Sequence, residues 1–307
     1  MFLEQGIKPQ NKFWKYLLGS LLILLGFSVG QFIISMCVML SASLNHKSKL
    51  PTTGNGTLSY LPPNVTLFLL LITYVIALLS MYFIFQYLHR QSFRSVTTSR
   101  LKIDWHRIFF AFWVSAVYWA FCYLIIISIF PDDQVFVFKP IPFLIYLSIL
   151  IFLTFVRSST EVTVYYGYLM QGFANLSGNR WFPIILIAVI SSIIYTLHPE
   201  ISAVEFLTVF IAHLIYTLFF CVLTLMDEGI ELAVGFNSAQ LLVTQLFFTS
   251  ESASLKTNAL FVVTNENPSF ENFVTTPVIC IIFLMICSKK YHWQNWQSKL
   301  TGKLKTT

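Results

Sequence analysis

Long apolar runs dominate this chain and restrict what it can fold into. Eight such runs are separated by short polar segments. They are Trp14–Ala42, Val65–Leu88, Ile108–Phe130, Ile141–Phe173, Trp181–His198, Phe206–Met226, Ile230–Phe248 and Phe273–Ser288. A helix needs roughly 20 mostly apolar residues to cross a bilayer. We therefore predict an all-α, multi-pass transmembrane helical bundle of about eight spans, with residues 1–307 forming a single integral membrane domain.

The composition excludes a water-soluble domain. Only 10% of the residues are charged and the mean hydropathy is +0.73, whereas a soluble domain carries about 25% charged residues. The lipid bilayer is thus the first expected partner. The net charge of +6 is confined to the segments between the runs, so it does not indicate a nucleic acid partner. The five cysteines lie in apolar runs without CxxC spacing, which indicates neither disulfides nor a thiolate metal site.

The basic residues predict the orientation of the chain. If the N-terminus is inside, 14 of the 19 Lys and Arg residues fall in inside segments and four fall outside, while Arg157 lies in the fourth run. Inside segments of membrane proteins carry an excess of Lys and Arg. This charge distribution therefore predicts an even number of spans, with the N- and C-termini both cytoplasmic. The aromatic tail Tyr291–Trp296 precedes further lysines and is typical of an anchor at the membrane interface.

Ionisable residues inside apolar runs are costly and are by default functional candidates. Arg157 and Glu161 are four residues apart, so they share a helix face and can pair. Two interpretations are open. Either the two charges simply neutralise each other, or Glu161 is a buried base or ligand whose pKa depends on its partner Arg157. His198 is expected at the interface, and His213 is expected to hydrogen-bond between helices. The acidic cluster 227–231 is expected to begin a helix.

The order of these polar segments carries a family resemblance. Glu161–Leu169 is followed by Ser191–His198 and then by Asp227–Leu241, each in a different run. This order resembles the three-motif core of the CPBP family, the CAAX proteases and bacteriocin-processing enzymes. The family pattern is Glu-Glu-x-x-x-Arg-Gly, then Phe-x-x-x-His, then His-x-x-x-Asn. The segments Asn179–Pro183 and Thr224–Gly229 also look like bacterial members, with the family-like core at about residues 140–250.

The resemblance implies an intramembrane metallo-endopeptidase centre that is only partly kept. Glu161 and His198 occupy retained positions, and Glu161 is implied to activate or hold the attacking water. Four positions are substituted: Val162 stands at the second glutamate, Tyr166 at the arginine, Asn237 at the histidine and Leu241 at the asparagine. The resemblance further implies the bacterial inner (cytoplasmic) membrane.

These substitutions predict that peptidase activity is lost. A catalytic zinc usually takes three protein ligands and a water, and Glu161 with His198 provides at most two. The amide of Asn237 is a poor substitute for imidazole, and losing one oxyanion donor costs on the order of 100–1000-fold in rate. We therefore expect that the chain binds no cofactor. Zinc would be its cofactor only if it is an active peptidase. His213 is a weak candidate for a replacement ligand.

Three functions follow from these residues. The first is a CPBP-type pseudoprotease that binds a transmembrane peptide or serves as an assembly subunit beside a membrane protein partner. The second is an active intramembrane endopeptidase that uses Glu161 and His198. The third is a small transporter or channel in which Arg157, Glu161 and His213 form a polar path, although the sequence shows no internal repeat of the kind common in transporters.

Overall fold

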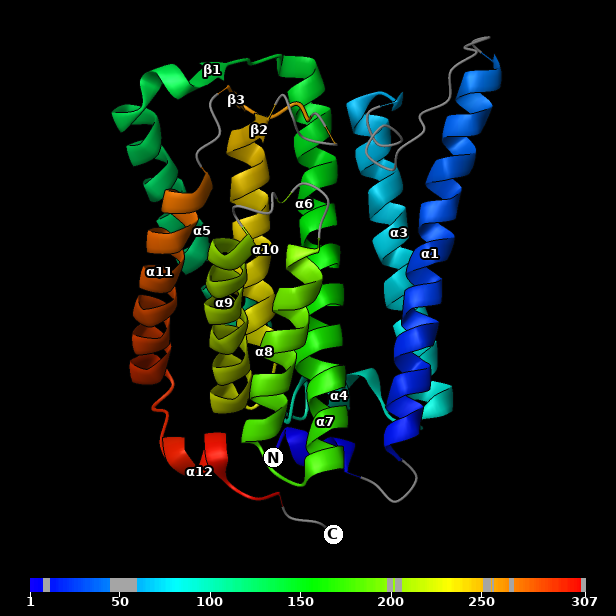
Figure 1. Cartoon of the computed structure of the whole chain (residues 1–307), viewed down its shortest axis with the longest axis vertical. Coiled ribbons are helices and arrows are strands. Elements are labelled where there is room, and N and C mark those ends of the chain that lie inside the picture. Colours follow the sequence, from blue (N-terminus) through cyan, green and yellow to red (C-terminus); the bar gives the residue numbers. More distant parts are fainter. Residues whose placement is uncertain are drawn as a thin grey trace.

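The computed structural model describes residues 1–7, 12–44, 60–197, 201, 206–250, 255, 257–264 and 268–304, without the side chains of 268–274. Helices make up nearly all of it, and the longer ones run side by side along the long axis of the molecule (Figure 1). The helices are η1 (Leu3–Gly6), α1 (Phe13–Leu44), α3 (Pro63–Phe83), η2 (Ile84–Leu88), α4 (Phe93–Thr97), α5 (Trp105–Ile129), η3 (Pro131–Asp133), α6 (Pro140–Val162), η4 (Thr163–Leu169), α7 (Met170–Ser177), α8 (Trp181–Thr196), α9 (Phe206–Asp227), α10 (Glu231–Phe247), α11 (Pro268–Lys290) and α12 (Trp296–Thr301).

The predicted all-α membrane bundle is confirmed at the level of fold class. In the described part of the chain, five helical stretches are long and apolar enough to cross a membrane. They are Phe13–Leu44, Pro63–Leu88, Trp105–Ile129, Pro140–Ser177 and Phe206–Asp227. The apolar helix α8 is shorter. Each of the eight apolar runs coincides with a helix, but a count of eight spans remains a prediction.

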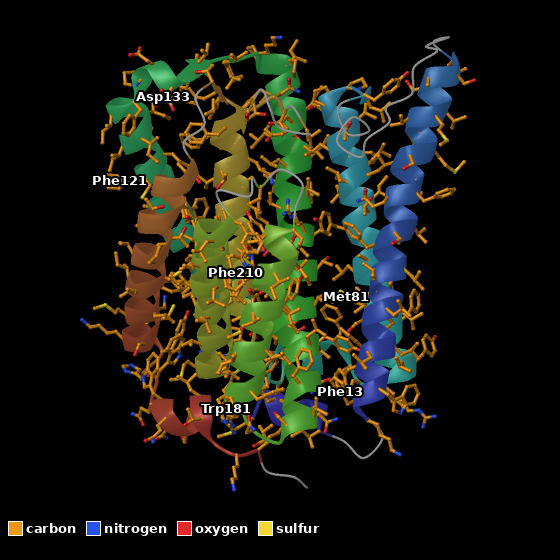
Figure 2. The ribbon with its side chains drawn as sticks, in the orientation of Figure 1. Phe13, Met81, Phe121, Asp133, Trp181 and Phe210 are labelled. Carbon is orange, nitrogen blue, oxygen red and sulfur yellow. The ribbon has the colours of Figure 1, made fainter. Side chains whose placement is uncertain are left out.

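The outward surface of the bundle is apolar, as contact with lipid requires. On α5 the residues Phe109, Trp113, Val117 and Phe121 follow one another at intervals of four and are 57–66% exposed. Figure 2 shows Phe121 pointing away from the other helices. In water such a stripe would be an aggregation liability, whereas in hydrocarbon it is well solvated.

Helix α10 lies at the centre of the bundle, packed against α5 and α6. From Glu231 to Ala239 every residue is buried. Ser115 of α5 donates a hydrogen bond to the carbonyl of Phe236 at 3.2 Å, and Ser158 of α6 donates one to the carbonyl of Val234 at 2.9 Å. Because α10 contacts protein on several sides, its polar residues meet side chains rather than lipid.

An ion network joins the connection between α9 and α10 to the start of α5. Arg100 pairs with Asp227 at 3.0 Å and with Glu231 at 3.1 Å. Arg107 pairs with the other oxygen of Asp227 and with Asp104. The carboxylate side chains of Asp227 and Glu231 are 1% and 0% exposed, so the arginines supply the counter-charge that burial demands.

The expectation for the acidic cluster is therefore only half right. Glu231 does begin α10, where a carboxylate favours the positive end of the helix dipole. Asp227 instead ends α9, because Glu228 adopts a left-handed conformation with φ of 58° and turns the chain. At the negative end of α9, Asp227 is held by Arg100 and Arg107 rather than by the dipole.

The two ends of the bundle differ. Met1 contacts Arg180 through its sulfur, and the amide of Leu304 donates to the carbonyl of Gly178 at 3.0 Å, so the first and last described residues share one end (Figure 1). The opposite end carries a small sheet that the apolar runs did not predict. Its strands β1 (Gln134–Phe136), β3 (Phe261–Val263) and β2 (Phe248–Ser250) lie in that order, antiparallel and then parallel.

A buried histidine lies beside the start of α1. The ring of His89, which follows the π-helical η2, is 0% exposed, and its Nε2 lies 2.8 Å from the hydroxyl of Tyr168. The Tyr16 ring lies 4.5 Å away, centroid to centroid. Burial, helped by the positive charge of Lys15, lowers the pKa of His89 to about 4, so the ring is neutral in the folded protein at neutral pH.

Acid is expected to destabilise the fold through His89. Between pH 6.5 and 4 the unfolded chain binds a proton that the folded chain does not, so stability falls as the pH falls. At about 1.4 kcal/mol per pH unit, the loss from pH 7 to pH 5 is about 2 kcal/mol. SDS titration in mixed micelles at both pH values, with His89→Gln as the comparison, measures it. Equal losses in the wild type and the variant would contradict this assignment.

Candidate functional site

Arg157 and Glu161 form the predicted pair on α6. The Nε of Arg157 donates to Oε1 of Glu161 at 2.8 Å, as their spacing of four residues predicts. The hydroxyl of Tyr74, on α3, approaches the same oxygen at 3.5 Å, and the guanidinium of Arg157 lies 5.7 Å from the centre of the Tyr74 ring. The two charged side chains are 34% and 32% exposed, so a ligand can still reach them.

The helix changes its winding directly after Glu161. Residues Pro140–Ser177 form one continuous helix of 38 residues, in which the η4 segment Thr163–Leu169 is π-helical. Such segments are rare and occur frequently at functional sites. No local pattern predicts this segment, because no proline interrupts the run between Val162 and Ser177.

Two of the positions compared with the CPBP pattern, Val162 and Tyr166, hold packing residues. Val162 is 1% exposed and belongs to the central apolar cluster. Tyr166 is 7% exposed, and its ring stacks on Phe220 of α9 with 5.1 Å between ring centroids. Neither side chain offers the carboxylate or guanidinium that the family pattern has there.

The other two substituted positions lie on α10. The hydroxyl of Tyr216, on α9, donates towards Oδ1 of Asn237 at 3.3 Å and also contacts the side-chain oxygen of Gln240. Asn237 is 9% exposed, so its amide serves as a link between helices, as polar side chains commonly do in membrane bundles. Leu241 is half-buried and apolar.

His213 makes the contacts expected of an interhelical histidine. Its Nδ1 lies 3.3 Å from the hydroxyl of Ser192 on α8 and 3.3 Å from that of Thr217 on its own helix. Its ring stacks on Tyr195 of α8 at 4.3 Å between centroids. The ring of Tyr216 lies 6.4 Å from the His213 ring, centroid to centroid.

Two groups of contacts lie inside the bundle, and together we call them the polar centre. The first holds Tyr74, Arg157 and Glu161 on α3 and α6, and the second holds Tyr195, His213, Tyr216, Asn237 and Gln240 on α8, α9 and α10. Sequence reasoning missed the tyrosines, because an aromatic residue in an apolar run has no local pattern that marks it. His198 lies outside the described residues, so its predicted place in this centre is untested.

The polar centre does not fit a zinc ion in the described part of the chain. No group of three His, Cys, Asp or Glu residues there lies close enough to share a metal. The carboxylate of Glu161 is engaged by Arg157, and Asn237 offers a neutral oxygen that already accepts from Tyr216. A catalytic zinc needs three protein ligands. We therefore derive no chemistry that passes through a metal.

Comparison with known proteins gives one relative of similar length. The chain is 24% identical to the uncharacterized protein YyaK of Bacillus subtilis (strain 168) over 280 residues, which is 89% of this chain and 90% of the relative. No protein-family model and no solved structure matches the chain. The fold and the site together define a class: an α-helical membrane protein with an arginine–glutamate pair and amide groups at its centre.

Proposed function

We propose that this chain is a non-hydrolytic protein of the CPBP intramembrane-protease type, which binds a transmembrane segment at its polar centre without cleaving it. The observation that carries the proposal is the Arg157–Glu161 pair at 2.8 Å. Hydrogen bonds between a guanidinium and a carboxylate are charge-assisted and strong. Oε1 of Glu161 is therefore engaged by Arg157 rather than by an attacking water.

The accessibility of the pair supports binding. Polar groups within a membrane bundle recognise partners by hydrogen bonds, and bulk water does not compete for these bonds there. About a third of each charged side chain is exposed, and Tyr195, in the second group of the polar centre, is 52% exposed. A passing helix with one polar residue would find both donors and acceptors there, whereas a purely apolar helix would gain only packing.

The membrane arrangement is part of the proposal. Eight spans would place both termini on one side, in agreement with their shared end in Figure 1. Basic residues gather at that end, including Lys12, Lys15, Arg180, Lys289 and Lys290. The positive-inside rule then makes it the cytoplasmic face, in a bacterial inner membrane if the family resemblance holds.

Cross-linking in proteoliposomes tests the proposal. A photoreactive amino acid replaces Tyr195, and the matched control replaces Phe121, which is 62% exposed on the outer face of α5. Transmembrane peptides carry either all leucine or one central Asn or Asp. A polar contact within lipid is worth about 1–2 kcal/mol, so the polar peptides should cross-link at position 195 about tenfold more than polyleucine, with no such preference at position 121.

Peptide integrity is measured in the same samples by mass spectrometry. We expect the peptide to remain intact. The double variant Arg157→Gln, Glu161→Gln removes both charges and keeps side chains of similar shape, and it should cross-link more weakly. Cleavage by the wild-type chain that is lost in Glu161→Gln would overturn the proposal in favour of an active endopeptidase. Equal cross-linking of polyleucine and polar peptides would show that the polar centre is not a recognition site.

A further inference from the structure

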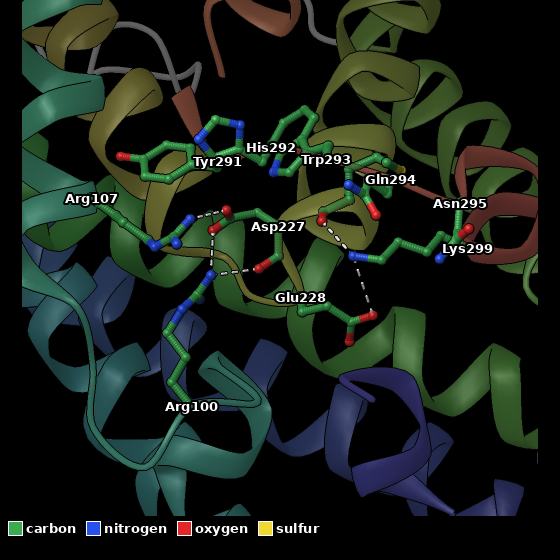
Figure 3. Close-up of a pocket in the computed structure, with 11 residues that line it drawn as sticks. Arg100, Arg107, Asp227, Glu228, Tyr291, His292, Trp293, Gln294, Asn295 and Lys299 are labelled. Atoms are coloured by element: carbon green, nitrogen blue, oxygen red, sulfur yellow. Dashed lines mark hydrogen bonds and ion pairs between the residues drawn. The ribbon is translucent and has the colours of Figure 1, made fainter. Parts of the chain in front are cut away.

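A second site lies at the end of the bundle that holds both termini. A pocket of about 340 Å³ opens there (Figure 3). Its walls are Arg100 and Arg107 near the start of α5, Asp227 and Glu228 at the end of α9, the connection 291–295, and Lys299 of α12. Pockets of about 300–1,000 Å³ are the usual size for small ligands. This pocket shares no residue with the polar centre.

The carboxylates of the pocket already have donors. The two oxygens of Asp227 accept from Arg100 and Arg107. Oε2 of Glu228 accepts from the backbone amide of Phe2 at 2.6 Å, and its Oε1 faces Lys299 at 3.8 Å. The carbonyls that end α9 are also satisfied: that of Met226 accepts from Lys299 at 2.9 Å and that of Asp227 accepts from Arg100 at 2.6 Å.

Hydrogen-bond donors, in contrast, remain in excess. Trp293 lines the pocket and is 9% exposed, yet its indole Nε1–H has no partner among the described residues. Arg107 hydrogen-bonds only through Nε and Nη1 within the described part of the chain. The ammonium of Lys299 has three N–H groups and two oxygens near it. Burial raises the pKa of Tyr291 to about 12, so no phenolate opposes an anion.

The backbone around the pocket is strained. Four non-glycine residues in the described part of the chain have positive φ, and three of them line this pocket: Glu228 at 58°, His292 at 50° and Asn295 at 58°. Left-handed non-glycine residues cost free energy and cluster at ligand sites, where the surrounding structure holds them. Here they turn the chain after α9 and after α11, and these turns form two of the walls.

The pocket lies where the apolar helices α9 and α11 end. α9 ends at Asp227 and α11 ends at Lys290. The ammonium of Lys290 lies 3.4 Å from the centre of the Phe110 ring, and the guanidinium of Arg107 lies 3.9 Å from that of Tyr291. Aromatic rings and cations in combination are typical of the headgroup region.

We propose that this pocket binds a phosphate-ester group, with Trp293 Nε1, Lys299 Nζ and Arg107 as its donors. A phosphate oxygen accepts several hydrogen bonds at once and matches a site with spare donors and two cations. The same chemistry is offered by a phospholipid headgroup and by a soluble phosphate compound. The proposal stands apart from the function of the polar centre, since neither site needs the other.

Isothermal titration of the full-length protein in a non-ionic detergent tests it. Three probes are used: dihexanoyl phosphatidylglycerol, inorganic phosphate, and dihexanoyl glycerol, which lacks the phosphate. Trp293→Phe removes the indole N–H and keeps an aromatic ring, while Lys299→Met removes the charge and keeps the stem. The matched controls are Trp181→Phe and Lys289→Met, outside the pocket. Thermal unfolding of each variant confirms that it is folded.

We expect a phosphate-bearing probe to bind and dihexanoyl glycerol not to bind. Trp293→Phe and Lys299→Met should each weaken binding at least about tenfold, as the loss of one hydrogen bond to a charged group does, and the controls should change it less than twofold. Binding of the lipid alone identifies a headgroup site, whereas competition by inorganic phosphate identifies a soluble ligand. The absence of phosphate-dependent binding, or equal affinities in folded variants, overturns the proposal and leaves a water-filled pocket.

Discussion

Replacing Arg100 by methionine is expected to lower the free energy of unfolding by about 3–5 kcal/mol, because removing one partner of a buried ion network leaves uncompensated charge. Arg100 faces both Asp227 and Glu231, whose carboxylates are 1% and 0% exposed. It also donates to the backbone carbonyl of Asp227. The variant therefore loses two ion pairs and a helix cap in one step. SDS titration in mixed micelles measures the change.

Lys102→Met is the matched control, since it removes a cation two residues away whose side chain is exposed. A surface charge of that kind is worth about 0–1 kcal/mol. A second variant, Arg100→Met with Glu231→Gln, removes one of the stranded carboxylates and should recover part of the loss. If it recovers none, stranded charge at Glu231 does not explain the effect of Arg100→Met.

Gly235→Ala is expected to cost about 3 kcal/mol, near the top of the range for overpacking a core. A Cβ at this position of α10 would overlap the backbone carbonyl oxygen of Ile108 on α5 and would lie 2.9 Å from the Cβ of Ala111. A helix carbonyl cannot rotate aside, so α5 and α10 must move apart. The hydrogen bond from Ser115 to Phe236 would lengthen as a result.

Gly26→Ala on α1 is the control for this prediction. Both substitutions gain the same helix propensity, about 1 kcal/mol, but at Gly26 the new Cβ meets mainly the side chain of Ser80. The hydroxyl of Ser80 can rotate aside, its Cβ lies 2.8 Å away, and no backbone atom of a neighbouring helix comes closer than 3.9 Å, so the cost should be smaller. Equal unfolding free energies for the two variants would show that the contact between α5 and α10 does not determine the stability of the bundle.

The helices could be located from the sequence because charge and proline mark their ends. The run Phe206–Met226 became α9 at Phe206–Asp227, and Trp14–Ala42 became α1 at Phe13–Leu44. The π-helical segment at Thr163–Leu169 and the three-residue strands escaped prediction. The strands depend on pairing between distant segments, and so short a strand has no detectable period.

Part of the candidate site was also predictable. Local spacing was sufficient to predict the contact between Arg157 and Glu161, since residues four apart on a helix must be neighbours. It was not sufficient for Tyr74 or Tyr216, whose partners lie on other helices and 21 to 87 residues away. The unusual polarity of α10 did carry information: a helix enclosed by protein tolerates Asn237 and Gln240, which lipid would not.

The contact between Phe2 and Glu228 has a consequence for the order of assembly during synthesis. The amide of Phe2 donates to a carboxylate 226 residues later in the chain, at 2.6 Å, and the side chains of Phe2 and Leu3 are buried at the same place. The ribosome must complete α9 before this docking place exists. Although residues 2 and 3 are made first, they can dock only after the turn at Glu228 has formed, so they are among the last to reach their final positions.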